Sequence, residues 1–140
     1  MDQGRLRRRL ILALGLALAA TPGLAGGRLR VLVQRSPLAG FQYHAAPRLW
    51  SELRRGEALS LRREAENPHD PRAIAVFRGA DQLGYLPRAE NDVVSQAMDE
   101  GRRLDVRIAG LRESGDPWQR VELEVFLISD GETTGHPGFP

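Results

Sequence analysis

The chain has 140 residues, 20 basic and 18 acidic side chains, and no cysteine. This length suits one compact domain with a single hydrophobic core. Without cysteine, disulfide bonds and thiolate ligands for zinc are excluded. We therefore expect a domain stabilised by packing alone, with no metal and no cofactor.

The first 25 residues have the pattern of a signal peptide. Four arginines within residues 5–9 precede an apolar run over residues 10–20, and small residues before Ala25 offer a cleavage site. The run is shorter than the roughly 20 residues that a membrane-spanning helix needs. A buried core helix is the alternative, but the basic flank and the Pro22-Gly23 break favour a signal peptide over residues 1–25. The protein is then expected to be periplasmic or secreted, with no membrane span after cleavage.

Cleavage would change the charge of the chain. The formal net charge is +2, but the leader holds four of the 20 arginines and one of the 18 acids, which leaves 16 against 17. The mature chain is thus almost neutral, and any nucleic-acid binding must come from a local patch.

Hydrophobic periodicity predicts the elements of the N-terminal half. Alternating apolar residues favour a strand over residues 28–35, and residues 41–44 are expected to form a short second strand. Pro47 opens a helical turn that ends before Gly56. A further strand begins at Leu59 and runs into a turn at residues 67–71, where Asn, Pro and Asp are typical turn formers.

The C-terminal half continues with a predicted hairpin of residues 73–78 and 82–86, in which Gly84 indicates a bulge or a close backbone approach. Apolar residues at helical spacing, Val93 among them, predict a helix over residues 90–100. Two more strands are expected over residues 104–111 and 121–128, joined by a polar loop at 113–117. Residues 130–140, rich in Gly and Pro, are expected to be a disordered tail. Apolar faces assign Trp50, Phe77 and Phe126 to the core, whereas Trp118 is expected to be exposed.

Short strands with two short helices predict a mainly β fold, most simply a small closed or partly open barrel. An α/β sheet is the alternative. It is disfavoured because neither helix connects purely apolar strands of the kind that parallel sheets bury.

Four segments together resemble a known family. They are Gly40-Phe41-Gln42-Tyr43, Asn67-Pro68-His69-Asp70-Pro71, Ala73-Ile74-Ala75-Val76-Phe77 and Leu83-Gly84-Tyr85-Leu86-Pro87-Arg88. Their order and spacing resemble the HIRAN family, within a predicted domain of residues 28–129. The resemblance implies a compact SH3-like or OB-like β-barrel. HIRAN domains at the head of DNA-remodelling helicases grip the free 3′ end of a single DNA strand, so it also implies single-stranded DNA as partner.

The resemblance implies a nucleic-acid interface, with Tyr43 stacking on a base and Arg88 near the path of the backbone. Two positions depart from the DNA-gripping members, because Gln42 replaces a basic group and His69 replaces a stacking aromatic. Each lost stack or phosphate contact weakens binding. The expected interface residues are Gln42, Tyr43, His69, Asp70, Tyr85 and Arg88.

Two of these residues have structural alternatives. Asp70 is placed to accept a hydrogen bond from a terminal hydroxyl, but it can instead build the turn. Tyr85 can bind a base or simply keep its ring half buried. Arg63 or Arg72 is expected to assist Arg88 in neutralising phosphate.

Catalysis is not expected. His69 and Asp70 are adjacent, but the other histidines are only His44 and His136, and no zinc-binding spacing accompanies them. The sequence also lacks a nucleophile elbow, a P-loop and a dinucleotide-binding glycine pattern.

Two functions remain open. The first is an exported, non-catalytic module that binds single-stranded DNA at its 3′ end. The second is a cell-envelope module for protein interaction that keeps the barrel and has lost DNA binding, as the near-neutral mature charge suggests. A positive, concave surface around Tyr43, His69 and Arg88 would favour the first, and a neutral or acidic one the second.

Overall fold

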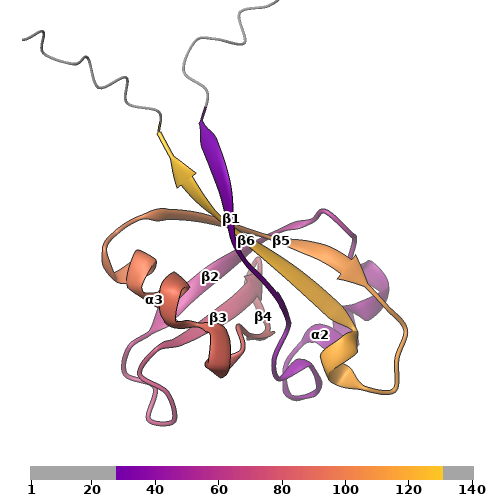
Figure 1. Ribbon diagram of the computed structural model, residues 1–140. Helices are drawn as coiled ribbons and strands as arrows, with labels where there is room; N and C mark the ends of the chain where they lie inside the picture. Colours follow the sequence, from indigo (N-terminus) through magenta and orange to yellow (C-terminus); the bar gives the residue numbers. More distant parts are fainter. Residues whose placement is uncertain (1–27, 131–140) are drawn as a thin grey trace, which may run out of the picture. The chain divides into compact units, whose positions relative to one another are not determined.

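Strands dominate the computed structural model, which describes residues 28–130 (Figure 1). The signal peptide expected at residues 1–25, and the expected tail after residue 130, lie outside this range. No helix within it has the length and apolarity that crossing a membrane requires. The strands are β1 Leu29–Pro37, β2 Ala58–Glu64, β3 Ala73–Arg78, β4 Asp81–Tyr85, β5 Arg103–Leu111 and β6 Val121–Ser129. The helices are α2 Ala46–Leu49 and α3 Asp92–Asp99, with 3-10 turns at Phe41–Tyr43, Trp50–Glu52, Arg88–Glu90 and Pro117–Gln119.

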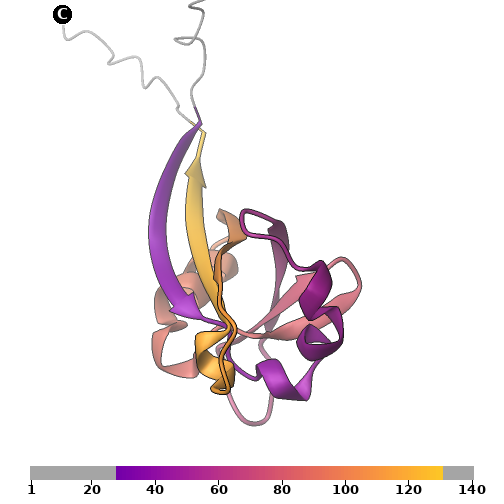
Figure 2. The same cartoon turned by 90° about the vertical axis from the view of Figure 1, so that its right-hand side faces the viewer.

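The six strands of the described residues form one sheet in the order β1-β6-β5-β2-β3-β4. β2 pairs with β3 and β5, β3 with β4, and β5 with β6, all antiparallel. Figure 2 shows β1 and β6 side by side. The ladder does not return from β4 to β1, so this is a partly open barrel. The prediction of a mainly β fold with two short helices is confirmed.

Residues 37–39, which follow β1, bring the two edges of the sheet together. The Leu38 N–H donates to the Val121 carbonyl on β6 (3.0 Å). The next residue, Ala39, exchanges two hydrogen bonds with Tyr85 at the end of β4, at 2.8 and 2.9 Å. This isolated bridge, together with the hydrogen bond from the Ala45 N–H to the Gln82 carbonyl (2.9 Å), joins the segment after β1 to β4.

The core lies inside the curved sheet. Val106 and Ile108 of β5 are opposed by the buried side chains of Leu123 and Val125 on β6. Burial of each such side chain contributes about 1.5 to 3 kcal/mol. The other buried members of the cluster come from β6, from other elements and from the segments between them. They are Leu38, Phe41, Ala46, Leu49, Leu53, Ile74, Val76, Leu83, Leu86, Val94 and Val121.

The strand expected at residues 41–44 is wrong, because this segment forms a 3-10 turn. Gly40 has a φ of 72°, which favours glycine, and its carbonyl accepts a hydrogen bond from the Tyr43 N–H (3.0 Å). The turn sends Phe41 into the core and leaves Tyr43 on the surface, with 79% of the residue exposed. In a strand, residues 41 and 43 would point to the same face, so the two aromatic side chains would lie at similar depths.

The assignment of Phe77 and Phe126 to the core is also wrong. Both rings are only partly buried and lie under guanidinium groups. Arg62 stacks over Phe77 at 4.5 Å, and Arg30 and Arg107 stack over Phe126 at 4.4 and 4.9 Å. Arginine thus covers apolar surface that the sequence pattern assigned to the interior.

Trp50, Trp118 and Val93 differ in how far their side chains are exposed. Trp50 is partly buried and packs edge-on against Phe41 at the margin of the core. Trp118 is 49% exposed, as predicted. Val93 is 63% exposed, which corrects its place on the apolar face of α3; Val94 occupies that face instead.

The close approach expected at Gly84 is confirmed, and it yields a stability prediction. A Cβ at this position would lie 2.3 Å from the Ala39 carbonyl oxygen and 3.0 Å from Leu38 Cδ1. Gly84→Ala must displace backbone, so we expect the free energy of unfolding to fall by about 1 to 3 kcal/mol or more. Urea denaturation measures this loss.

Gly115→Ala is the matched control. No atom lies within 4 Å of a Cβ built there, and the backbone has no positive φ. This variant should be neutral, or more stable by up to about 1 kcal/mol. Equal stabilities of the two variants would contradict the close packing at Gly84.

Candidate nucleic-acid interface

The turn between β2 and β3 is held by side chain to backbone hydrogen bonds. Asn67 Oδ1 accepts from the N–H groups of His69 (2.9 Å) and Asp70 (3.3 Å). Asp70 Oδ1 accepts from the Arg72 N–H (2.9 Å), and the Asp70 carbonyl accepts from the Ala73 N–H (3.0 Å). Asn67 and Asp70 therefore build the turn, as expected. Their hydrogen bonds hold the backbone of His69 in place.

Asp70 also ties this turn to the start of α3. Its residue exposure is 8%, and its Oδ2 accepts a hydrogen bond from Asn91 Nδ2 (2.8 Å). Burial raises the pKa of Asp70. The hydrogen bonds from the Arg72 amide and from Asn91, with the charges of Arg88 and Arg72, together outweigh burial and hold the pKa below its ordinary value. Asp70 is thus a buried anion that the fold keeps ionised.

Four of the six predicted interface residues line one hollow of about 290 Å³. We call it the end hollow. The turn contributes His69 and Asp70, β4 contributes Tyr85, and the 3-10 turn after β4 contributes Arg88. The remaining lining residues are Ala39, Asn67, Ala73 and Leu86.

Gln42 and Tyr43 do not line the end hollow. Both are exposed residues of the 3-10 turn Phe41–Tyr43, a few residues after Ala39, which does line it. Four of the six residues expected at the interface thus line one hollow in the structure, and Gln42 and Tyr43 lie outside it.

Tyr85 is half buried, and its hydroxyl is engaged. It donates to Glu64 Oε1 (2.8 Å), which also accepts from Asn67 Nδ2 (3.0 Å). The His44 ring lies edge-on to the Tyr85 ring, with centroids 5.5 Å apart. The structural alternative foreseen for Tyr85 is thus observed, and the ring forms a wall of the hollow.

The basic residues expected at the site differ in their partners. Arg63 and Arg72 form ion pairs with Asp99 (3.0 Å) and Asp92, respectively. Within residues 28–130, the Arg88 guanidinium forms no hydrogen bond or ion pair and acts on Asp70 only through its charge. Arg88 is therefore the cation that the hollow offers to a ligand.

The charge of the end hollow is balanced, since its ionised lining residues are Arg88 and Asp70. No group of three His, Cys, Asp or Glu side chains that could hold a metal ion occurs in the described part of the chain. The chemistry on offer is one cation, one hydrogen-bond acceptor and two aromatic surfaces.

Asn91 and Glu64 were missed by sequence reasoning. Asn91 precedes α3 with no local partner pattern, and its contact with Asp70 joins residues 21 positions apart. Glu64 ends β2, where alternation gives no hint that a tyrosine hydroxyl will reach it. Both depend on tertiary packing.

The model of the HIRAN domain family matches residues 31–129. The chain belongs to the HIRAN family. HIRAN domains are generally associated with nucleic-acid binding.

Two solved structures are similar to this HIRAN domain. A crystal structure of a protein from Lactobacillus plantarum has 29% sequence identity and a TM-score of 0.63, covering 73% of this chain and 98% of that chain. The crystal structure of the HIRAN domain of human HLTF has 19% identity and a TM-score of 0.57, covering 74% of this chain and 82% of that chain. The HLTF likeness supports the fold alone. No curated protein matches the sequence.

The depressed pKa of Asp70 predicts a pH dependence of stability. Its stabilising contribution is complete above the ordinary aspartate value of 3.8 and is lost as the pH falls through the lower pKa of the folded state. Wild type should exceed Asp70→Asn in unfolding free energy at neutral pH, and the difference should shrink below pH 3.8. Urea denaturation at both pH values tests this; a constant difference would contradict it.

Proposed function

We propose that this HIRAN domain binds the 3′ end of a single-stranded nucleic acid, primarily DNA, without catalysis. The observation that carries the proposal is the end hollow, in which an unpaired Arg88 faces a buried, ionised Asp70 between aromatic side chains. Family membership supports the nucleic-acid class of ligand.

An ionised carboxylate inside the hollow favours an end over the middle of a strand. Asp70 repels a phosphate but can accept a hydrogen bond from a terminal hydroxyl. Each of its oxygens already accepts one hydrogen bond, from the Arg72 amide and from Asn91, and a carboxylate oxygen accommodates two. Arg88 can then neutralise the last phosphate.

Two exposed aromatic side chains provide stacking surface. Tyr43 and His69 are both exposed, and they come from separate segments of the chain. Stacking of a base on an aromatic side chain contributes about 1 to 3 kcal/mol and tolerates any sequence. Gln42, beside Tyr43, supplies a hydrogen bond but no charge to the backbone.

A second function, as an envelope module for protein interaction, rests on a different observation. The charges lining the end hollow cancel, and the Tyr85 hydroxyl is already bonded to Glu64. A hollow with no net charge suits a polypeptide as well as a nucleic acid. Binding measurements with strand ends separate the two functions.

The sharpest prediction concerns the chemistry of the end. An oligonucleotide with a 3′-OH should bind better than the same strand with a 3′-phosphate, because the phosphate adds repulsion from Asp70 and removes the donor. The difference should be about 1 to 3 kcal/mol, the range for a hydrogen bond to a charged group. Fluorescence anisotropy with labelled strands measures it.

Two variants accompany this measurement. Asp70→Asn should shrink the preference for the hydroxyl, whereas Tyr43→Ala should weaken both strands alike through lost stacking. Equal binding of the two ends, or no binding at low salt, would contradict end recognition and favour the envelope module for protein interaction.

We also propose that the domain acts outside the cytoplasm, as the pattern of residues 1–25 indicates. The mature chain should then begin near Gly26. Intact-mass measurement of protein from a periplasmic extract checks this. A chain that retains Met1 in a cytosolic fraction would contradict export.

A further inference from the structure

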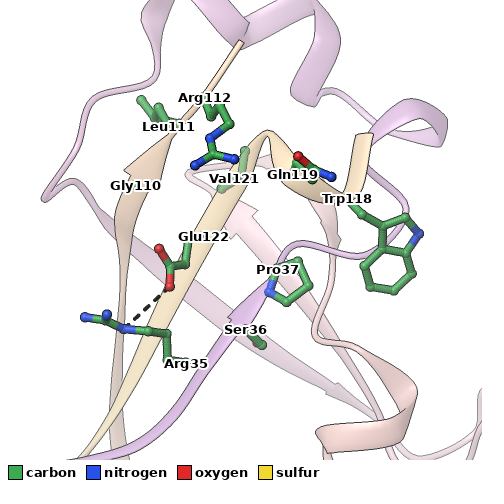
Figure 3. A pocket seen from close by; sticks show the side chains of 10 residues that line it. All are labelled: Arg35, Ser36, Pro37, Gly110, Leu111, Arg112, Trp118, Gln119, Val121 and Glu122. Carbon is green, nitrogen blue, oxygen red and sulfur yellow. Dashed lines mark ion pairs between the residues drawn. The ribbon is translucent and has the colours of Figure 1, made fainter. Parts of the chain in front are cut away.

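A second and larger hollow lies where β1 and β5 end and β6 begins. It has a volume of about 580 Å³, and we call it the Trp118 groove. Figure 3 shows the Arg35–Glu122 ion pair (3.6 Å) toward one side and the Trp118 indole beside Pro37 toward the other. Arg112 completes the lining from the loop after β5.

Two of these side chains are available to a ligand. Trp118 is 49% exposed on its 3-10 turn, where the Asp116 side chain accepts a hydrogen bond from its N–H (3.0 Å) and holds the turn in place. Within the described residues, the Arg112 guanidinium has no hydrogen bond or ion pair. The groove thus presents a half-exposed indole and a free cation.

The groove adjoins a second hollow, and the joint lining of the two is basic. Arg35 also lines an adjoining hollow of about 480 Å³, together with Arg55, Arg107 and Glu124. The two hollows together hold four arginines and the two glutamates 122 and 124, a formal excess of two positive charges. The end hollow has no such excess. A polyanion is therefore attracted more strongly to the groove than to the hollow that would hold its end.

The groove and the end hollow adjoin one short segment. Pro37 lines the groove and Ala39 lines the end hollow, with Leu38 buried between them. Two residues span at most about 7 Å. The 3-10 turns that carry Tyr43 and Trp118 also contact each other. A strand leaving the end hollow past Tyr43 can enter the groove directly.

We propose that the Trp118 groove binds the part of the single strand that precedes its 3′ end. Trp118 stacks on a base, and Arg112 and Arg35 neutralise phosphates. A basic groove that carries aromatic side chains is the usual means of holding a single strand without sequence preference. This inference rests on the proposed function, since it assigns a path to the strand whose end the other hollow holds.

Strand length separates the two sites experimentally. The probes are a labelled dinucleotide with a 3′-OH and a strand of about 12 nucleotides that ends in the same dinucleotide. At low salt, the longer strand should bind at least about tenfold more tightly, with a steeper salt dependence. Arg112→Ala and Trp118→Ala should each remove about tenfold of this gain and leave dinucleotide affinity unchanged.

Two control variants separate the loss of groove contacts from a general loss of positive charge and from unfolding. Arg102→Ala removes another exposed arginine, at the opposite end of β5, and should leave both affinities unchanged. Trp118→Phe keeps an aromatic face and should retain part of the gain. The only other tryptophan is Trp50. Quenching of tryptophan emission by the longer strand should therefore disappear in Trp118→Phe.

The outcomes distinguish this inference from the proposed function. Unchanged long-strand affinity in both groove variants, or an equal loss for the dinucleotide, would overturn the groove. A long strand that binds through Trp118 and is insensitive to Arg88→Ala and to its 3′ chemistry would support the groove and overturn end recognition. Absence of binding by either probe would overturn both.

Discussion

The two hydrogen bonds between Ala39 and Tyr85 are the contact on which the rest of the site depends. They join the segment after β1 to β4, and they form only because Gly84 leaves room for the Ala39 carbonyl. Without this approach, one wall of the end hollow would be missing. The neighbouring turn that exposes Tyr43 would also lose its anchor, since it begins directly after Ala39. The absence of a side chain at Gly84 thus positions one wall of the end hollow.

Asp70 shows how one carboxylate can serve both fold and site. Its hydrogen bonds with the Arg72 amide and Asn91 join the β2–β3 turn to α3. The same bonds keep it ionised although it is buried. A charge that the fold already holds in place needs no reorganisation when a ligand arrives, which lowers the entropic cost of recognition.

The local parts of this structure were predictable from sequence. The turn at residues 67–71 and the hairpin after it carry their signals in adjacent residues, and the structure has both. By contrast, the 3-10 turn Phe41–Tyr43 sends Phe41 into the core and leaves Tyr43 exposed, a difference in depth that the sequence pattern did not indicate. Periodicity alone could not reveal that arginines would cover Phe77 and Phe126, because the covering side chains come from other strands.

The same division holds for the candidate site. The family resemblance assigned His69, Asp70, Tyr85 and Arg88 to one interface. In the structure these four residues line one hollow, since the turn and the end of β4 lie at the two ends of one hairpin. No sequence signal indicated that other arginines, Arg63 and Arg72, would form ion pairs with acidic residues of α3. Charge availability is a property of the folded surface, which a list of basic residues does not contain.

Arginine is more abundant on the groove side of residues 37–39 than on the side of the end hollow. This difference affects how a nucleic acid would first meet the protein. A protein whose total charge is small exerts little attraction at a distance, and physiological salt screens its field within about 8 Å. A basic face beside a neutral hollow instead produces a local field, which attracts a nearby polyanion at short range and orients it toward the groove. Productive collisions would then depend on rotation at close range, so ionic strength would alter the fraction of encounters that succeed more than their frequency.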